Sequence, residues 1–224
     1  MKKRVLSFLL ALLLVLPLSG CAEGSYSAGQ QELQAFENLQ LECAAAGVRI
    51  VRGESYAISW QVQGELSADL EGDTLVVKQH RPRAKYEDGD NYITLTLPQG
   101  ASLQSVSLSS AAGEVVMEGL SVDMLRIVCA AGSVQLRYMA VGESELNVAA
   151  GNLYFGGSIG NTALVVSAGD AEMQLLGDPA HCYVDYSVAV GHLWLDERTA
   201  YSAEEAQYVI EADVAVGDFK LMFP

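Results

Sequence analysis

Hydrophobic and polar residues alternate along the second half of the chain, and a glycine that follows a small residue interrupts the alternation at intervals. The spacings between successive glycines are 19, 19, 18, 22 and 26 residues. A repeat of this length is typical of a solenoid. The six glycines are Gly113, Gly132, Gly151, Gly169, Gly191 and Gly217.

Alignment on the glycine shows which positions face inward. The positions five and three before it, and two and four after it, are hydrophobic in 23 of 24 cases. Each repeat is therefore predicted to hold two short strands with one buried face, joined at a bend that the glycine permits. The predicted fold is all-β, a right-handed parallel β-solenoid of stacked coils. A meander or propeller is the rival, but propeller blades need about 40 residues.

A less regular region precedes these repeats. Leu41 to Val51 follow the same pattern with Ala46 in the glycine position, and alternation recurs over Tyr56–Val62, Thr74–Lys78 and Tyr92–Leu97. Because the end of a solenoid must be covered, residues 36–98 are predicted to form irregular N-terminal coils that cap it. Residues 99–224 then hold the regular repeats of a single domain over 36–224.

The first 20 residues have the pattern of a secretory signal peptide. Basic residues at positions 2–4 precede an apolar stretch, Val5 to Leu18, that is shorter than the roughly 20 residues of a membrane span. The stretch ends in Leu18-Ser19-Gly20-Cys21, which resembles the lipobox of bacterial lipoproteins. The resemblance implies cleavage before Cys21 and acylation of its thiol; an ordinary signal peptide is the alternative. The small and polar residues over 21–35 are predicted to form a flexible tether.

The net charge of the chain limits which partners it can bind and how it can attach to a membrane. The chain has 224 residues, 13 of them basic and 28 acidic, for a net charge of −15. Without the three basic residues of the leader, ten basic residues stand against 28 acidic ones, a net of −18. Half of the chain is hydrophobic, which excludes a disordered acidic tail, and the acidity argues against a nucleic-acid partner. Anionic head groups repel such a domain, so attachment to the bilayer would depend on the acylated Cys21.

These features predict an exported protein, lipid-anchored to the outer face of the cell membrane. A Gram-positive outer face is favoured; in a Gram-negative cell the periplasmic side is expected. Besides the bilayer, cell-wall glycan or another envelope protein is the expected partner. The sequence leaves the oligomeric state open.

The search for catalytic chemistry gives no motif. Nucleophile elbows, phosphate-binding loops and Cys/His clusters are absent from the sequence, so neither catalysis nor a cofactor or metal is predicted. The outward acids Glu114, Asp170, Glu172 and Asp218 are expected on different coils and columns, where they serve solubility. Cys43, Cys129 and Cys182 are expected to be buried free thiols, the first two several coils apart.

Two surface features suggest contacts. The basic residues Lys78, Arg81, Arg83 and Lys85 could touch anionic wall polymers or lipid head groups, or form a solvated loop. Tyr154 and Trp194 share the outward column three after the glycine, and exposed aromatic residues suit a sugar or protein contact. Cover by a loop over residues 196–207 is the alternative for these two.

Three segments together resemble a bacterial β-solenoid family named "putative adhesin". They are the strand and proline of Ile93–Pro98, the steps Ala168-Gly169-Asp170 and Val216-Gly217-Asp218, and the terminal strand Gly217–Phe223. The resemblance implies a non-catalytic adhesion or binding scaffold and supplies no catalytic residues. The alternatives are a component of envelope-stress sensing and a glycan-active β-helix enzyme.

Overall fold

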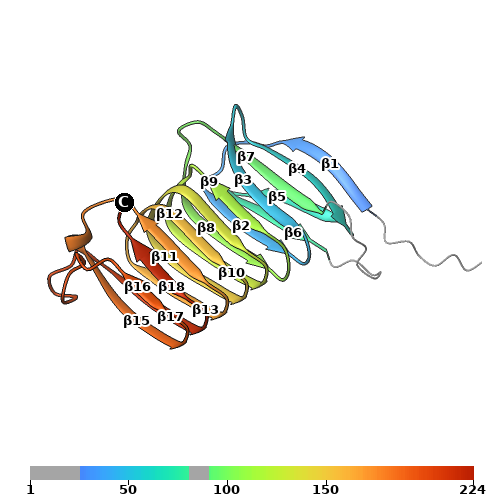
Figure 1. Ribbon diagram of the computed structural model, residues 1–224. Helices are drawn as coiled ribbons and strands as arrows, with labels where there is room; N and C mark the ends of the chain where they lie inside the picture. The colour runs from blue at the N-terminus through green and yellow to red at the C-terminus, as the bar shows by residue number, and fades with distance from the viewer. Residues whose placement is uncertain (1–25, 81–90) are drawn as a thin grey trace, which may run out of the picture.

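The computed structural model describes residues 26–80 and 91–224, and this part of the chain is all-β, as predicted (Figure 1). Its 18 strands form one continuous hydrogen-bonded sheet, and the only helix is the 3-10 turn η1 (Pro179–His181). The strands are β1 (Tyr26–Glu32), β2 (Asn38–Cys43), β3 (Gly47–Gly53), β4 (Ala57–Gln63), β5 (Leu66–Glu71), β6 (Thr74–Gln79), β7 (Tyr92–Pro98), β8 (Ser102–Ser110), β9 (Val115–Glu118), β10 (Ser121–Ala131), β11 (Val134–Ala150), β12 (Leu153–Ile159), β13 (Thr162–Ala168), β14 (Ala171–Leu175), β15 (Cys182–Val190), β16 (Leu193–Leu195), β17 (Tyr208–Val216) and β18 (Phe219–Met222).

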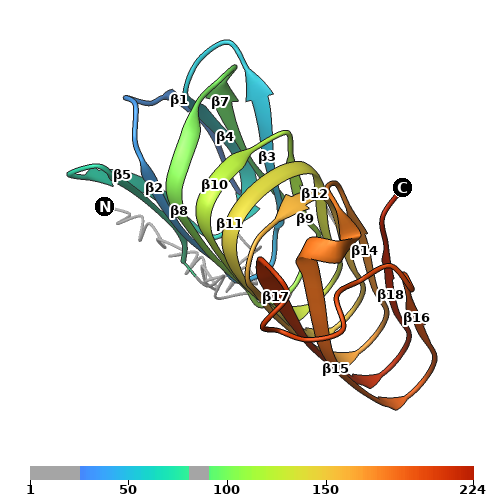
Figure 2. The ribbon, with the colours of Figure 1, turned by 90° about the vertical axis from the view of Figure 1, so that its left-hand side faces the viewer.

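The sheet is wound into stacked coils, which overlap as rings when the molecule is viewed along the stack (Figure 2). Each regular coil has a first strand before the glycine and a second strand after it, and strands of neighbouring coils pair in parallel. The long strand β11 serves two coils, because its beginning pairs with β9 and its end with β13. We call the two sides of the stack the first face, which carries β8, β10, β13, β15 and β17, and the second face, which carries β9, β12, β14, β16 and β18.

The glycines of the repeat lie directly above one another. Gly151 has a φ of +139°, and a Cβ added to it would overlap the carbonyl oxygen of Gly132 in the next coil. Gly113 meets the carbonyl of Ala46 in the same way, which confirms that Ala46 occupies the glycine position of its coil. The corner therefore needs glycine for two reasons: the left-handed backbone conformation and the close approach of the neighbouring coil.

The predicted inward columns form the hydrophobic core. Val148, Leu153 and Phe155 are almost wholly buried, as are their counterparts in the other inner coils. Removing these aligned apolar side chains from water is the main force that holds the coils together.

The order of the coils in space differs from their order in the sequence at both ends of the stack. The last coil of the chain, β17/β18, lies between β13/β14 and β15/β16. Likewise β2/β3 lies between β6/β7 and β8/β9. The longer glycine spacings of 22 and 26 residues fit this arrangement, because the chain must pass the place of one coil and return to fill it.

The N-terminal region is a mixture of parallel and antiparallel pairs. The expected strands over 56–62, 74–78 and 92–97 correspond to β4, β6 and β7, while β4 pairs antiparallel with β7 and β5 with β6. The sheet as a whole is therefore mixed, although the repeats themselves are parallel. The right-handed sense of the coils stays a prediction.

The predicted tether over residues 21–35 is wrong for residues 26–32, which form β1 and pair antiparallel with β4. The sequence lacks apolar alternation here, so backbone pairing and one local contact hold the strand. The Trp60 indole lies where a side chain on Gly29 would stand, and its Nε1 donates to Ser27 Oγ over 3.1 Å. The predicted leader and Cys21 lie outside the described residues. Within the described ranges, no helix has the length and apolar character required to cross a bilayer.

Candidate functional site

The most promising binding surface is a row of outward side chains on the second face, which we call the aromatic row. Its members are Tyr154 on β12, Glu172 on β14, Lys220 on β18 and Trp194 on β16, in that spatial order. They occupy one column on four successive coils, so the two predicted aromatic residues belong to one surface but are not neighbours. At about 4.8 Å per coil, the row is about 14 Å long.

Hydrogen bonds connect the polar part of the row. The Tyr154 hydroxyl donates to Gln174 Oε1 over 3.3 Å, and Gln174 Nε2 donates to Glu172 Oε1 over 3.0 Å. Lys220 Nζ lies 3.5 Å from the same carboxylate oxygen. These contacts hold the Tyr154 ring and the ammonium group in place before any ligand binds, which lowers the entropy cost of binding.

Trp194 forms the other end of the row and is 49% exposed. Its ring packs against that of His192, with 5.4 Å between centroids and 31° between planes, and His192 Nδ1 lies 3.3 Å from Asp218 Oδ1. The alternative that the loop over residues 196–207 covers the aromatic residues is therefore wrong for Trp194, half of whose surface remains exposed.

A hollow of about 500 Å³ borders the Tyr154 end of the row. Tyr138, which is 76% exposed, is the only non-glycine residue with a positive φ (+54°) among the described residues. It lies at the point where the register of β11 against β12 shifts, between Leu136 and Met139. Sequence reasoning missed Tyr138 because it stands outside the four aligned columns. The hollow is lined by Arg137, Tyr138, Tyr154, Gly156, Gly157, Gln174, Leu176 and Pro224.

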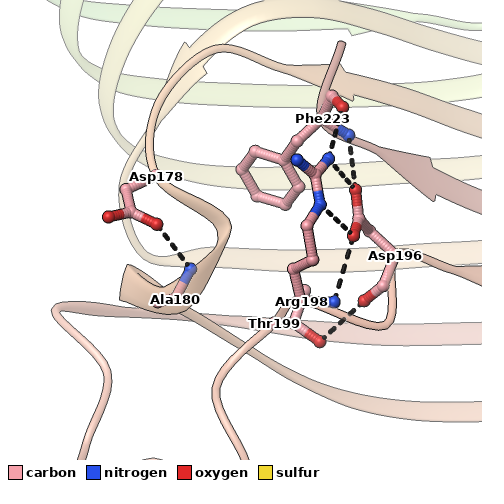
Figure 3. A network of polar contacts seen from close by, with 6 residues as sticks. All are labelled: Asp178, Ala180, Asp196, Arg198, Thr199 and Phe223. Atoms are coloured by element: carbon pink, nitrogen blue, oxygen red, sulfur yellow. Dashed lines mark hydrogen bonds and ion pairs between the residues drawn. The ribbon is translucent and has the colours of Figure 1, made fainter.

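A second hollow of about 460 Å³ borders the Trp194 end, lined by Trp194, Leu195, Asp196, Lys220, Leu221 and Met222. Its rim is held by a polar clamp between Asp196 and Arg198 (Figure 3). The guanidinium donates from Nε and Nη2 to the carboxylate over 2.8 and 2.6 Å, and also to the Phe223 carbonyl over 2.8 Å. The hydrogen bond from Arg198 holds the pKa of Asp196 well below its usual range.

The first face carries a larger groove, of about 710 Å³, but its charge is different. Glu143, Glu145, Asp185 and Glu211 line it, and its single cation, Arg126, lies 3.4 Å from Glu145. Such a groove repels anionic polymers. On the second face Lys220 is likewise paired with Glu172, but the hollow beside Tyr154 is lined by Arg137 and by no acidic residue.

Asp170 and Asp218 lie on different coils, as predicted, but the prediction that they lie in different columns is wrong. These two occupy one column on adjacent coils, and Asp170 Oδ1 accepts from the backbone N–H of Asp218 over 2.9 Å. Their carboxylates thus satisfy backbone donors of the next coil. Within the described ranges, no group of three or more His, Cys, Asp or Glu side chains could hold a metal ion.

The structure describes only part of the predicted basic run. Lys78 points outward from β6, between Glu42 of β2 and Ser67 of β5. Arg81, Arg83 and Lys85 lie outside the described residues, so their contact with anionic polymers stays a prediction.

The three cysteines of the described region are free and buried, as predicted. The expected wide separation of Cys43 and Cys129 is wrong, because a single coil, at Ser110, lies between them. This separation of about 10 Å is still too long for a disulfide. Burial raises the pKa of all three thiols, that of Cys182 to about 11.

These features define an all-β protein of stacked coils with a polar-aromatic surface. Residues 36–177 match the family Toastrack DUF4097, and the chain belongs to this family. No curated protein matches the chain by sequence.

Comparison with solved structures finds similar bacterial proteins. A "putative cell adhesion protein" from Clostridium sporogenes superposes with a TM-score of 0.55 at 12% identity, over 89% of this chain and 100% of that one. A "putative adhesin" from Bacteroides fragilis gives a TM-score of 0.41 at 10% identity, over 89% and 98% of the two chains. The likeness to the first protein shows a shared fold.

Proposed function

We propose that this protein is a lipid-anchored envelope protein that binds extended wall glycan, without catalysis, through the aromatic row. One observation carries the proposal: Tyr154 and Trp194 stand on the same column of the second face, with charged and amide side chains between them. Aromatic faces offer apolar area to pyranose rings, while Lys220 and Gln174 can hydrogen-bond to hydroxyl or carboxylate groups.

The geometry favours an elongated ligand over a small one. The two rings lie at opposite ends of a row about 14 Å long, and the hollows beside them are open to solvent. A polymer that follows the stacking direction would meet both rings. Arg137, in the hollow beside Tyr154, also suits an anionic wall polymer, despite the net charge of the whole chain.

The resemblance to adhesin-like structures supports a binding role. The similar Clostridium sporogenes structure carries the name of a cell adhesion protein, and adhesion by this chain is inferred from its surface. The alternative is that the protein is a component of envelope-stress sensing. The same fold could serve that role, but no described residue favours it over glycan binding. We also infer that the coils return in the right-handed sense usual for parallel β-connections.

Attachment to the outer face of the membrane through acylated Cys21 is part of the proposal. Strand β1, the first described element, lies at one end of the stack, and β15 and β16 lie at the other (Figure 1). An anchor before β1 would therefore leave the Trp194 end of the row far from the bilayer. Mass spectrometry of the mature N-terminus should find Cys21 with its acyl groups; an unmodified Cys21 would contradict this part of the proposal.

The binding claim is tested by co-sedimentation with insoluble wall glycan. Tyr154→Ala combined with Trp194→Ala should abolish co-sedimentation. Tyr201→Ala is the control, because Tyr201 is 92% exposed but lies outside the row. Equal co-sedimentation of the parent protein, the double variant and the Tyr201→Ala control would refute the assignment of the aromatic row as the glycan site.

A further inference from the structure

The end of the stack opposite β1 exposes a strand edge. Strand β15 pairs with β17 alone, so along the described chain no strand covers its other edge. The Ala200 N–H donates to the Cys182 carbonyl over 2.9 Å, so the loop after β16 occupies only the beginning of this edge. The stretch from Tyr183 to Val190 remains available for backbone pairing.

The side chains of this coil are also incompletely covered. Tyr186 belongs to an inward column in which Leu164 and Ala212 are 1% and 2% exposed, yet Tyr186 itself is 48% exposed. The column continues to the end of the stack and then has no further coil against which to pack.

The edge strands at the two ends of the stack differ in how well they are protected against pairing with another chain. At the N-terminal end, the antiparallel strand β5 covers β6 and carries Asp69 and Glu71, charges of the kind that discourage pairing with another chain. Strand β15 has one charged residue, Asp185, no proline and no lysine, and is rich in Val and Tyr. It lacks the devices that usually protect an edge strand.

We infer that the protein forms a two-fold dimer in which β15 of one copy pairs antiparallel with β15 of a second copy. In an antiparallel pair related by a two-fold axis, inward side chains stay inward only if one residue lies opposite its own copy at the axis. An axis at Asp185 would oppose two like charges, which is unfavourable. An axis at Ser187 places Tyr186 opposite Val188 and Val184 opposite Val190, sets Asp185 against Ala189, and leaves the occupied Cys182 carbonyl outside the ladder.

This dimer would explain both the unpaired edge of β15 and the exposure of Tyr186. The backbone edge from Val184 to Val190 gains a partner, and the half-covered inward column packs against the same column of the second copy. A contact of this kind is closed, because each copy uses the same patch and β15 then has no free edge for a third chain. The inference is independent of the proposed glycan contact, since the aromatic row lies on the second face.

Sedimentation equilibrium of the chain from residue 21 onward, carrying Cys21→Ser to prevent acylation, tests the inference. The unaltered β15 should give a concentration-dependent dimer. Ser187→Lys should raise the dissociation constant by roughly tenfold or more, because two lysines then face each other at the axis. Within one copy the new lysine lies beside Asp213, so the fold should tolerate it.

Ser109→Lys is a matched control. Ser109 occupies the same outward column on the inner strand β8 and also has an acidic neighbour, Glu42. Dimerisation should be unchanged in this variant. A monomer at every concentration, or equal dimerisation by the two lysine variants, would overturn the inference.

Amide hydrogen exchange provides a second measurement of dimerisation, made on the Cys21→Ser protein with its native β15. Protection over residues 183–190 should increase with protein concentration, and protection of the inner strand β13 should not. Protection over 183–190 that stays constant across the dimerisation range would also overturn it.

Discussion

Asp170 and Asp218 lie 48 residues apart in the sequence, yet the carboxylate of Asp170 accepts a hydrogen bond from the Asp218 backbone N–H over 2.9 Å. The same relation recurs on both sides: Asn152 Oδ1 accepts from Asp170 N, and Asp218 Oδ1 accepts from His192 N. The side chain of the residue after the corner glycine thus forms a hydrogen bond to the backbone of the next coil. These bonds continue through the inserted last coil of the chain, β17/β18.

Substitution of Asp170 should separate this role from surface charge. Asp170→Ala removes the acceptor and should lower the free energy of unfolding by about 1 kcal/mol. Asp170→Asn keeps an acceptor oxygen, as Asn152 does in the preceding coil, and should stay within about 0.5 kcal/mol of the parent. Urea unfolding measures both. Equal losses in the two variants would show that the charge, and not the hydrogen bond, matters.

The glycine ladder predicts a large effect from one methyl group. Gly151→Ala should lower the free energy of unfolding by more than about 3 kcal/mol, because left-handed strain adds to overlap with the Gly132 carbonyl. Gly177 is the matched control: its φ is +135°, but no atom lies within 4 Å of an added Cβ. Gly177→Ala should show only strain, about 1–2 kcal/mol. Thermal or urea unfolding compares the two, and similar losses would contradict close approach as the reason for glycine.

The buried thiols should be inert in the folded protein. Burial raises the pKa of Cys43, Cys129 and Cys182, and the thiolate is the reactive form. Iodoacetamide at about pH 8 should therefore modify none of the three until denaturant is added. Peptide mass spectrometry locates the modified sites. Rapid modification of Cys182 in the native state would contradict its burial.

Stability should respond to acid through Asp196. Its folded-state pKa is lowered by Arg198, so its contribution is complete above the ordinary carboxyl value of about 4 and is lost as the pH falls through the lowered value. Asp196→Asn removes this titration. The parent should be more stable than the variant at pH 7, and the difference should shrink as the pH falls below about 4. Denaturant unfolding across this range gives the comparison; a difference that does not change with pH would exclude the clamp as its origin.

The sequence predicts the coil cross-section well because local physics determines it. Alternation places Val148 and Phe155 inside, and the glycine columns mark the corners, so strand positions follow from the repeat alone. The spatial order of coils depends on long-range pairing: β17 fits against β13 as well as β15 does by pattern, and only packing of the whole stack decides between them. The sequence does not predict strand β1, because this strand has no apolar face of its own.

The candidate site could be predicted only in part. The shared column in the sequence predicts Tyr154 and Trp194, but the distance between them depends on the insertion of β18 between β14 and β16. Tyr138 has no repeat signature, because a register shift and not a column places it beside Tyr154.

Tryptophan fluorescence tests the central claim, that the aromatic row binds glycan, most directly. The chain has two tryptophans, so Trp60→Phe leaves Trp194 as the only reporter. Titration with soluble wall-glycan fragments should shift its emission to saturation, and adding Tyr154→Ala should weaken the apparent affinity by about tenfold, since one stacked ring contributes on the order of 1–2 kcal/mol. No change in emission, or equal affinity with and without Tyr154, would contradict the proposal.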